Sequence, residues 1–153
     1  MFLNFNGDLR KEEDLVLSAG NRGFRYGDGL FETMLVQDGS VRLGRYHIDR
    51  LSAGMRMLRL EPAASFSTDT IESWIRDLCM MNRLKADCRA RLTVFRATGG
   101  MYNVPDSRAG YLLQVGETGL AADGAGLTLG VFPEGRKVCD ALAALKSNNY
   151  LLS

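Results

Sequence analysis

The segment LFETMLVQDGSVRL, residues 30–43, constrains the fold most strongly, because it has the pattern of a β-hairpin. An apolar run precedes an Asp-Gly pair, and a shorter run that contains apolar residues follows it. Asp-Gly readily supplies the positive φ angles of a two-residue hairpin turn. We therefore expect two antiparallel strands that are joined by a tight turn at Asp38 and Gly39.

Two amphipathic helices are predicted to follow the hairpin. The first spans residues 45–60, where apolar side chains recur at helical spacing, at Ile48, Leu51, Met55 and Leu58. The second spans residues 65–85, and Thr68 or Asp69 is expected to cap its N-terminus. Its apolar stripe consists of Ile71, Trp74, Ile75, Leu78 and Met81.

Further strands are predicted on both sides of this central block. They are MFLNFNG at 1–7, which ends in an Asn-Gly turn, CRARLTVFRATGG at 88–100 and AGYLLQVGE at 109–117. Residues 11–29 have the composition of a loop. The order of strand, hairpin, two helices and two strands predicts an α+β fold for residues 1–117.

A domain boundary is predicted at residues 118–126, where TGLAADGAG has the composition of a connector. Beyond it, LTLGVFPE at 127–134 is expected to be a strand, and residues 138–153 are expected to pass from a loop into a helix. Residues 1–117 would then be a small N-terminal α+β domain, and residues 127–153 would begin a larger second domain.

The charge balance argues against nucleic-acid and membrane partners. The 19 lysines and arginines and the 18 aspartates and glutamates give a net charge of +1, so no strong basic field is available. No apolar run is long enough to span a membrane, and MFLNFNGDLR lacks the regions of a signal peptide. We therefore expect a soluble, cytoplasmic protein with a small-molecule or protein partner.

Cysteine and histidine usage predicts no metal site. Cys79, Cys88 and Cys139 form no CxxC motif, and His47 is the only histidine in the sequence. A structural zinc site needs a fuller set of cysteine and histidine ligands. The three cysteines are instead expected to be reduced, buried thiols.

Three motifs give a more specific signal. RGFRYGDGLFET at 22–33 enters the predicted hairpin, HIDRL at 47–51 begins the first helix, and LKSNNYL lies at 145–151. In this order and at these separations they resemble the class IV pyridoxal-phosphate enzymes, which include branched-chain aminotransferases, D-amino acid aminotransferases and 4-amino-4-deoxychorismate lyases. The resemblance implies a D-amino acid aminotransferase-like fold, pyridoxal 5′-phosphate as the cofactor and a homodimer.

The resemblance also assigns cofactor-binding and catalytic roles. Lys146 would be the Schiff-base lysine, which needs a neutral amine sheltered from water, and it would carry a proton to and from the substrate Cα. Arg50 would bind the cofactor phosphate through its planar donor groups. Tyr150 would donate a hydrogen bond to the cofactor ring oxygen. The residues alone leave three plainer readings open: a surface lysine, an exposed helix arginine and a packed aromatic.

Substrate contacts are expected, from the same resemblance, at Phe31, Glu32, Tyr26 and Arg96. Phe31 and Glu32 are neighbours in a strand, so only one of them can face the pocket directly. Arg96 matches a position that helps to hold the substrate carboxylate in D-amino acid aminotransferases. The plainer readings are a core aromatic, a solvated carboxylate and a strand-end arginine. His47 is expected to cap or pack the helix rather than to act as an acid or base.

Three functions stay open at this point. The first is an enzyme that transfers an amino group between an amino acid and a 2-oxo acid. The second is a 4-amino-4-deoxychorismate lyase that forms 4-aminobenzoate and pyruvate, and the third is a non-catalytic, truncated module for binding or dimerisation. In class IV enzymes, the carboxylate that contacts the pyridine nitrogen follows the lysine well downstream, beyond Ser153. These residues alone are therefore expected to be a partial chain and a poor catalyst.

Overall fold

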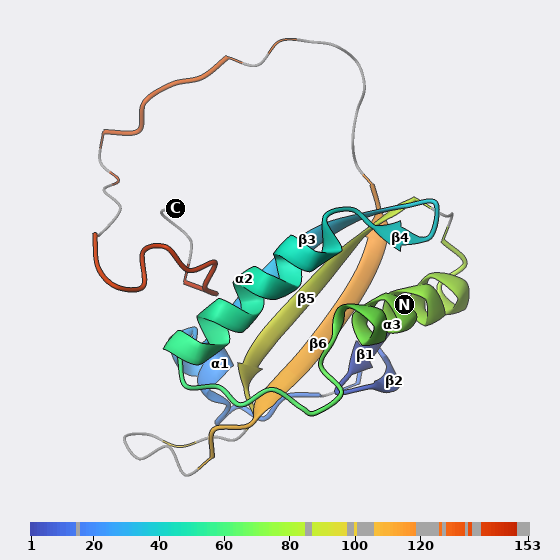
Figure 1. The fold of residues 1–153 in the computed structure, drawn as a ribbon, viewed down its shortest axis with the longest axis horizontal. Helices are drawn as coiled ribbons and strands as arrows, with labels where there is room; N and C mark the ends of the chain where they lie inside the picture. Colours follow the sequence, from blue (N-terminus) through green and yellow to red (C-terminus); the bar gives the residue numbers. More distant parts are fainter. Residues whose placement is uncertain are drawn as a thin grey trace.

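The computed structural model describes residues 1–14, 16–84, 87–97, 100, 106–118, 126, 128–133, 135 and 139–149. Within these residues, six strands form one antiparallel sheet, and two long helices lie across one of its faces (Figure 1). None of the described helices is both long and apolar enough to cross a lipid bilayer. This arrangement confirms the predicted α+β class.

The predicted hairpin forms one edge of the sheet. Strands β3 (Gly29–Gln37) and β4 (Ser40–Val41) pair antiparallel, with Val36 opposite Val41. The backbone φ angles of Asp38 and Gly39 are 49° and 75°, as a tight turn of this kind requires. The Asp-Gly pair therefore sets the register of the hairpin.

The other strands extend the sheet from β3. Strand β5 (Cys88–Arg96) pairs with β3 along its whole length, and β6 (Ala109–Glu117) pairs with β5. Strands β1 (Phe2–Phe5) and β2 (Asp8–Lys11) complete the order β2-β1-β6-β5-β3-β4. Strand β2 was not predicted, because its exposed DLRK sequence has no apolar alternation.

The helices are α1 (Arg22–Tyr26), α2 (Gly44–Met57) and α3 (Thr68–Met81). The two long helices confirm the prediction, while the short α1 falls in the segment that was expected to be a loop. The N-cap of α3 is Ser67, one residue before the expected Thr68, because the Ser67 hydroxyl accepts a hydrogen bond from the Thr70 N–H.

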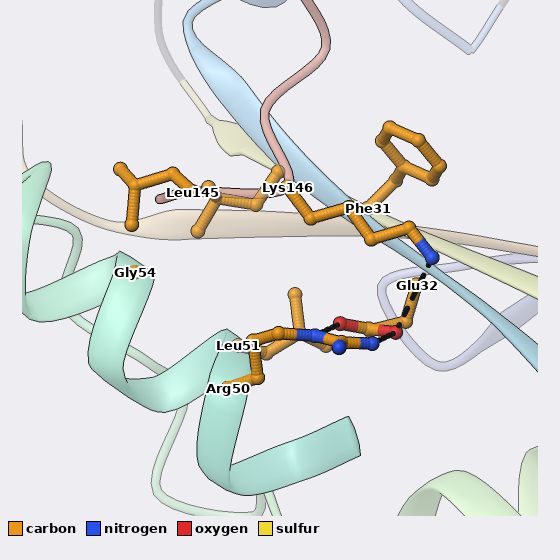
Figure 2. A pocket seen from close by; sticks show the side chains of 8 residues that line it. Phe31, Glu32, Arg50, Leu51, Gly54, Leu145 and Lys146 are labelled. Carbon is orange, nitrogen blue, oxygen red and sulfur yellow. Dashed lines mark hydrogen bonds and ion pairs between the residues drawn. The ribbon is translucent and has the colours of Figure 1, made fainter. Parts of the chain in front are cut away.

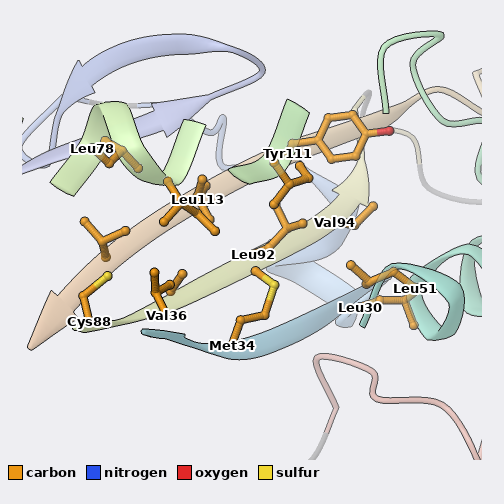
Figure 3. Packing of buried hydrophobic residues seen from close by; sticks show 14 of the residues in the cluster. Leu30, Met34, Val36, Leu51, Leu78, Cys88, Leu92, Val94, Tyr111 and Leu113 are labelled. Atoms are coloured by element: carbon orange, nitrogen blue, oxygen red, sulfur yellow. The ribbon is translucent and has the colours of Figure 1, made fainter. Parts of the chain in front are cut away.

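The core lies between the sheet and the two long helices (Figure 3). Ala90, Leu92 and Val94, the alternating apolar residues of β5, are fully buried as predicted. From the expected stripe of α3, Ile71, Ile75 and Leu78 are buried, Trp74 is half-buried and Met81 is exposed. Burial of these apolar side chains is the main force that holds helices and sheet together.

Two predictions for the last part of the chain are wrong where the structure describes it. Residues 128–133 form no strand, and Leu129 and Val131 are almost fully exposed. Residues 139–149 form turns rather than a helix. Ser147 and the two asparagines that follow it favour turns over helix, because their side chains compete for backbone hydrogen bonds. The division of the chain into two domains stays a prediction.

Candidate active site

Strand β3 places a carboxylate on the apolar side of the sheet. Leu30, Met34 and Val36 are buried there, and Glu32 has the same parity along the strand. The Glu32 side chain is consequently 0% exposed. An ionised carboxylate in such a place needs charged or hydrogen-bonding partners.

Helix α2 and the segment after residue 139 supply those partners (Figure 2). Arg50 donates to both oxygens of Glu32, through Nε to Oε1 and through Nη2 to Oε2, the latter at 2.6 Å. His47 Nδ1 lies 2.7 Å from Oε2, and Lys146 Nζ lies 3.6 Å from the same oxygen. The structure therefore brings three predicted site residues, Glu32, Arg50 and Lys146, into one charge cluster, together with His47.

The cluster keeps Glu32 ionised. Burial raises the pKa of Glu32, but hydrogen bonds from Arg50 and His47 and the positive charge of Lys146 outweigh it, so the pKa lies below its ordinary value. The Glu32 carboxylate in turn raises the pKa of Arg50. The site thus holds one fixed negative charge between two basic side chains.

Lys146 reaches this cluster because its backbone lies along the free edge of β3. The Phe31 N–H donates to the Lys146 carbonyl at 2.9 Å, and the Asn148 N–H donates to the Gly29 carbonyl at 3.0 Å. These bonds flank an isolated antiparallel bridge between Leu30 and Ser147. The segment is therefore held like a short added strand, with the lysine beside Glu32.

Gly29 permits this close approach. A Cβ atom on Gly29 would lie 2.5 Å from the Val94 carbonyl oxygen and 2.7 Å from Asn148 Nδ2. Any side chain there would push apart β3, β5 and the segment of Lys146. Asn148 itself was not singled out from the sequence, where it reads as a loop residue.

A shallow pocket with a cavity volume of only about 10 Å³, partly open to solvent, lies beside the cluster. It is lined by Leu30, Phe31, Glu32, Arg50, Leu51, Gly54, Leu145 and Lys146. Small-molecule sites usually have about 300–1,000 Å³. The described residues thus form one wall of a site. Lys146 is 33% exposed, so they do not by themselves shelter its amine as the sequence predicted.

Phe31 lies in contact with the lysine. The Lys146 Nζ is 5.0 Å from the centroid of the Phe31 ring, and the Arg91 Cζ is 3.9 Å from it. Tyr26, by contrast, lies at the end of α1, half exposed, and is not part of the pocket wall. Tyr150 lies outside the described residues, so its predicted role is untested.

Arg96 belongs to a second charge cluster. Its Nε donates to Asp28 at 3.0 Å, and its terminal nitrogens donate to the carbonyls of Leu58 and Arg59 after α2. Arg22 donates to the same Asp28 oxygen at 2.7 Å. Burial raises the pKa of Asp28, but the two guanidinium groups lower it by more than burial raises it. The pKa of Asp28 therefore lies below its ordinary value. The structure does not bring Arg96 into the wall around Lys146.

The sequence prediction missed Asp28. It lies between two glycines in the RGFRYGDGLFET motif, and a carboxylate in such a loop has no local feature that distinguishes a buried acid from a solvated one. Its long-range partner Arg96 comes from strand β5.

Among the described residues, no group of three histidine, cysteine or acidic side chains is arranged to hold a metal ion.

Comparison with known proteins gives the family of this chain. Residues 29–153 match the family described as amino-transferase class IV. The chain belongs to the class IV aminotransferase family. The matching range begins at β3 and covers Glu32, Arg50 and Lys146, so it contains the whole charge cluster.

Individual class IV relatives differ in their reactions. An aminodeoxychorismate lyase of Bacillus subtilis is 34% identical over 90 residues, which are 58% of this chain and 30% of the lyase. A putative branched-chain-amino-acid aminotransferase of Methanocaldococcus jannaschii is 30% identical over 101 residues, 66% of this chain and 34% of that protein. The matched parts thus span about a third of the length of these relatives.

A solved class IV structure shows that the fold is shared. The branched-chain amino acid aminotransferase of Escherichia coli superposes with a TM-score of 0.77 at 22% identity, over 99% of this chain and 53% of that chain. The predicted D-amino acid aminotransferase-like fold is therefore confirmed.

The donor set of the charge cluster fits a phosphorylated cofactor such as the pyridoxal phosphate of class IV enzymes. Arg50 is 52% exposed and uses Nε and Nη2 for Glu32, and within the described residues its Nη1 has no protein acceptor. Two basic side chains around one carboxylate leave a net positive charge, which suits a phosphate dianion. A lysine amine within the same cluster is the group that can condense with an aldehyde.

Proposed function

We propose that the protein containing this chain uses pyridoxal 5′-phosphate to transfer an amino group between an amino acid and a 2-oxo acid. The observation that carries the proposal is that Lys146 and Arg50 both form an ion pair with one buried carboxylate, that of Glu32. The amine needed for covalent attachment and the guanidinium needed for phosphate binding are thus held in one cluster. When bound, the cofactor would supply the electron sink for reactions at the substrate Cα.

Arg50 would bind the cofactor phosphate. Glu32 fixes two of its nitrogens, which orients the guanidinium plane before any ligand arrives. A preorganised arginine loses less side-chain entropy on binding than a free one does. We propose that Glu32 acts through Arg50 as a positioning residue, since its fully buried carboxylate is already engaged by Arg50, His47 and Lys146.

Lys146 would hold the cofactor covalently and then move the Cα proton. Its segment is held on β3 by two backbone hydrogen bonds, from the Phe31 N–H to the Lys146 carbonyl and from the Asn148 N–H to the Gly29 carbonyl, so the backbone that carries the amine is fixed. Phe31 would form the apolar wall beside the transferred proton. Proton transfer by a positioned side chain of this kind typically contributes about 10²–10⁴-fold to rate.

Three further residues that the sequence placed at the site are proposed to have smaller roles. Tyr150 is proposed to contact the cofactor ring and Tyr26 to face the substrate entrance. Arg96 is proposed to act on substrate binding only through Asp28 and the backbone that it holds, since its guanidinium bonds that carboxylate and two carbonyls. In line with the family resemblance, the whole protein is proposed to be a cytoplasmic homodimer.

The second candidate function is 4-amino-4-deoxychorismate lyase activity. The Bacillus subtilis relative with that name supports it, at 34% identity. Both reactions begin with removal of the Cα proton, a step in which Lys146 would have the same role. They differ in whether a β-elimination follows, which splits off pyruvate and leaves the ring with its amino group as 4-aminobenzoate.

A product assay separates the candidates. The purified protein, with added pyridoxal phosphate, is incubated with amino acid and 2-oxo acid pairs, and separately with 4-amino-4-deoxychorismate. Formation of a new amino acid supports transfer, while 4-aminobenzoate and pyruvate support the lyase. Activity in neither assay, together with cofactor that fails to bind folded protein, would favour the non-catalytic module, whose dimerisation can be measured by light scattering.

A further inference from the structure

The structure brings two cysteines into contact, and neither belongs to the charge cluster of Glu32 or lines the pocket beside it. Cys79 lies near the end of α3, and Cys88 is the first residue of β5. Their Sγ atoms are 3.1 Å apart. Since a disulfide bond is about 2.05 Å long, the two sulfur atoms need to approach by roughly 1 Å to bond.

The backbone fixes this contact. Helix α3 ends in a Schellman motif, in which the Leu84 N–H donates to the Cys79 carbonyl and the Arg83 N–H donates to the Met80 carbonyl. Arg83 takes the left-handed conformation, with a φ of 54°, as the motif requires. The motif ends the helix at Asn82, three residues after Cys79, and fixes the backbone at this end of α3.

A second contact anchors the same helix end to the sheet. The Asn82 side chain accepts a hydrogen bond from the Phe2 N–H at 2.7 Å and donates one to the Phe2 carbonyl at 2.9 Å. The end of α3 is therefore tied to β1 on the sheet in which β5 lies. The closeness of the two thiols follows from these contacts rather than from a mobile side chain.

The two thiols differ in access. Cys88 is 0% exposed within the core, whereas Cys79 is only partly buried at the border of it. A reagent from solution therefore reaches Cys79 first. Cys139 is exposed and lies in another part of the chain.

We propose that Cys79 and Cys88 are an oxidisable thiol pair, a modification site at which a small-molecule disulfide such as oxidised glutathione closes an intramolecular disulfide between α3 and β5. This inference does not depend on the proposed function. The sequence predicted three reduced, buried thiols, and the structure agrees with burial for Cys88 but not for Cys139.

The oxidation proceeds by two thiol–disulfide exchanges. The Cys79 thiolate attacks one sulfur of the small disulfide, whose S–S bond breaks, and one small thiol leaves with a proton. The Cys88 thiolate then attacks the Cys79 sulfur, which forms the protein disulfide and releases the second small thiol. Two cysteine thiols are oxidised by two electrons in total, and one small disulfide is reduced to two thiols.

The second exchange is the slow one. Burial, together with the neighbouring Cys79, raises the pKa of Cys88 to about 12. Because only the thiolate attacks, ring closure should keep accelerating by up to about tenfold per pH unit above pH 9, where a thiol of ordinary pKa is already largely ionised.

The test uses the protein that contains residues 1–153, with the substitution Cys139→Ser, which removes the exposed thiol. Folded protein is incubated with oxidised glutathione, and its intact mass is measured without reductant. We expect the mass of two hydrogens to be lost, with Cys79 and Cys88 joined in the peptide map. The melting temperature should rise by about 5 °C or more and return after addition of dithiothreitol.

Two further variants assign the order of attack. Cys88→Ala should stop at one glutathionyl group on Cys79, and Cys79→Ala should leave Cys88 unmodified while the protein stays folded. Circular dichroism checks the fold of both, and if Cys88→Ala does not fold, the pH dependence of closure in the Cys139→Ser protein takes its place. A stable glutathionyl group on Cys79 of the Cys139→Ser protein, or reaction only after unfolding in urea, would overturn the proposal.

Discussion

The carboxylate of Glu32 and the guanidinium of Arg50 form a two-pronged ion pair across the β3–α2 interface, with both oxygens of the acid engaged. The acid is fully buried and the arginine is half exposed. The guanidinium group of Arg50 is thus anchored on a buried acid and remains accessible from the pocket. Lys146 approaches the same acid from the edge of the sheet. The geometry of the proposed cofactor site therefore depends on one buried carboxylate, which lines the pocket and contacts both basic side chains.

Replacing this acid should destabilise the fold and disorder the site. Glu32→Gln keeps the shape but removes the charge that Arg50, His47 and Lys146 share. We expect a loss of about 1–3 kcal/mol in the free energy of unfolding, reduced from that of a fully buried pair because Arg50 and Lys146 are partly exposed. Urea denaturation followed by circular dichroism measures it.

Glu13→Gln serves as the matched control. Glu13 is 71% exposed, and its nearest cation, Lys11, lies 3.9 Å away. Its replacement should change the stability by less than about 0.5 kcal/mol. Equal effects of the two substitutions would mean that the charge cluster around Glu32 contributes nothing special.

The stability of the fold should decline in acid through Glu32 and Asp28. Both have pKa values below their ordinary values of 4.5 and 3.8. A lowered pKa contributes stability that is complete above the ordinary value and is lost as the pH falls through the lower, folded-state value. We expect the unfolding free energy to fall from about pH 4.5 downward. Glu32→Gln should flatten this decline, and an unchanged slope would be inconsistent with the ion pairs described.

Gly29 should tolerate no side chain. In Gly29→Ala, the new methyl group would meet the Val94 carbonyl and Asn148, which should cost about 1–3 kcal/mol. Gly116→Ala in β6 is the control, because nothing lies within 4 Å of the position of its Cβ. Thermal unfolding of both proteins tests this, and a stable Gly29→Ala variant would contradict the packing of the Lys146 segment against β3.

Asp28 and Arg96 should be energetically coupled. Their side chains are 12% and 8% exposed and share a hydrogen bond, so a double-mutant cycle with Asp28→Asn and Arg96→Met should give a coupling energy of about 0.5–3 kcal/mol. The cycle that combines Asp28→Asn with Glu32→Gln should be additive within about 0.5 kcal/mol, since the two acids have different partners. If Asp28→Asn and Glu32→Gln were coupled while Asp28→Asn and Arg96→Met were additive, the two charge clusters would not be the separate units described here.

Much of the fold could be predicted because its signals are local. The Asp-Gly turn at residues 38–39, the helical spacing of α2 and the alternation of β5 each determine their own element. The proximity of Lys146 and Arg50 was expected only from the family resemblance. No pattern of spacing joins two residues so far apart in the sequence.

The burial of Glu32 could have been predicted from the alternation of the strand, but the sequence prediction did not use this pattern. Leu30, Met34 and Val36 share its parity in the strand, so alternation alone places Glu32 on the buried face. A buried acid must have partners, and HIDRL, in the helix expected to follow the hairpin, supplies two basic side chains, His47 and Arg50. The sequence prediction instead gave Glu32 a substrate contact.

The segment of Lys146 could not be predicted from local propensity. Its alanines and leucines favour a helix, but Phe31 and Gly29 offer an unpaired strand edge to Lys146 and Asn148. Tertiary pairing of this kind outweighs the small differences in helix propensity.

The most direct test of the account is to identify the lysine that binds the cofactor. The protein as it exists, containing residues 1–153, is loaded with pyridoxal phosphate, reduced with borohydride and digested for mass spectrometry. We predict a phosphopyridoxyl group on Lys146, its loss in Lys146→Ala, and weaker loading in Arg50→Ala, which remains folded by circular dichroism. Labelling of Lys11, or of any lysine other than Lys146, with an unmodified Lys146 in folded protein would contradict the account.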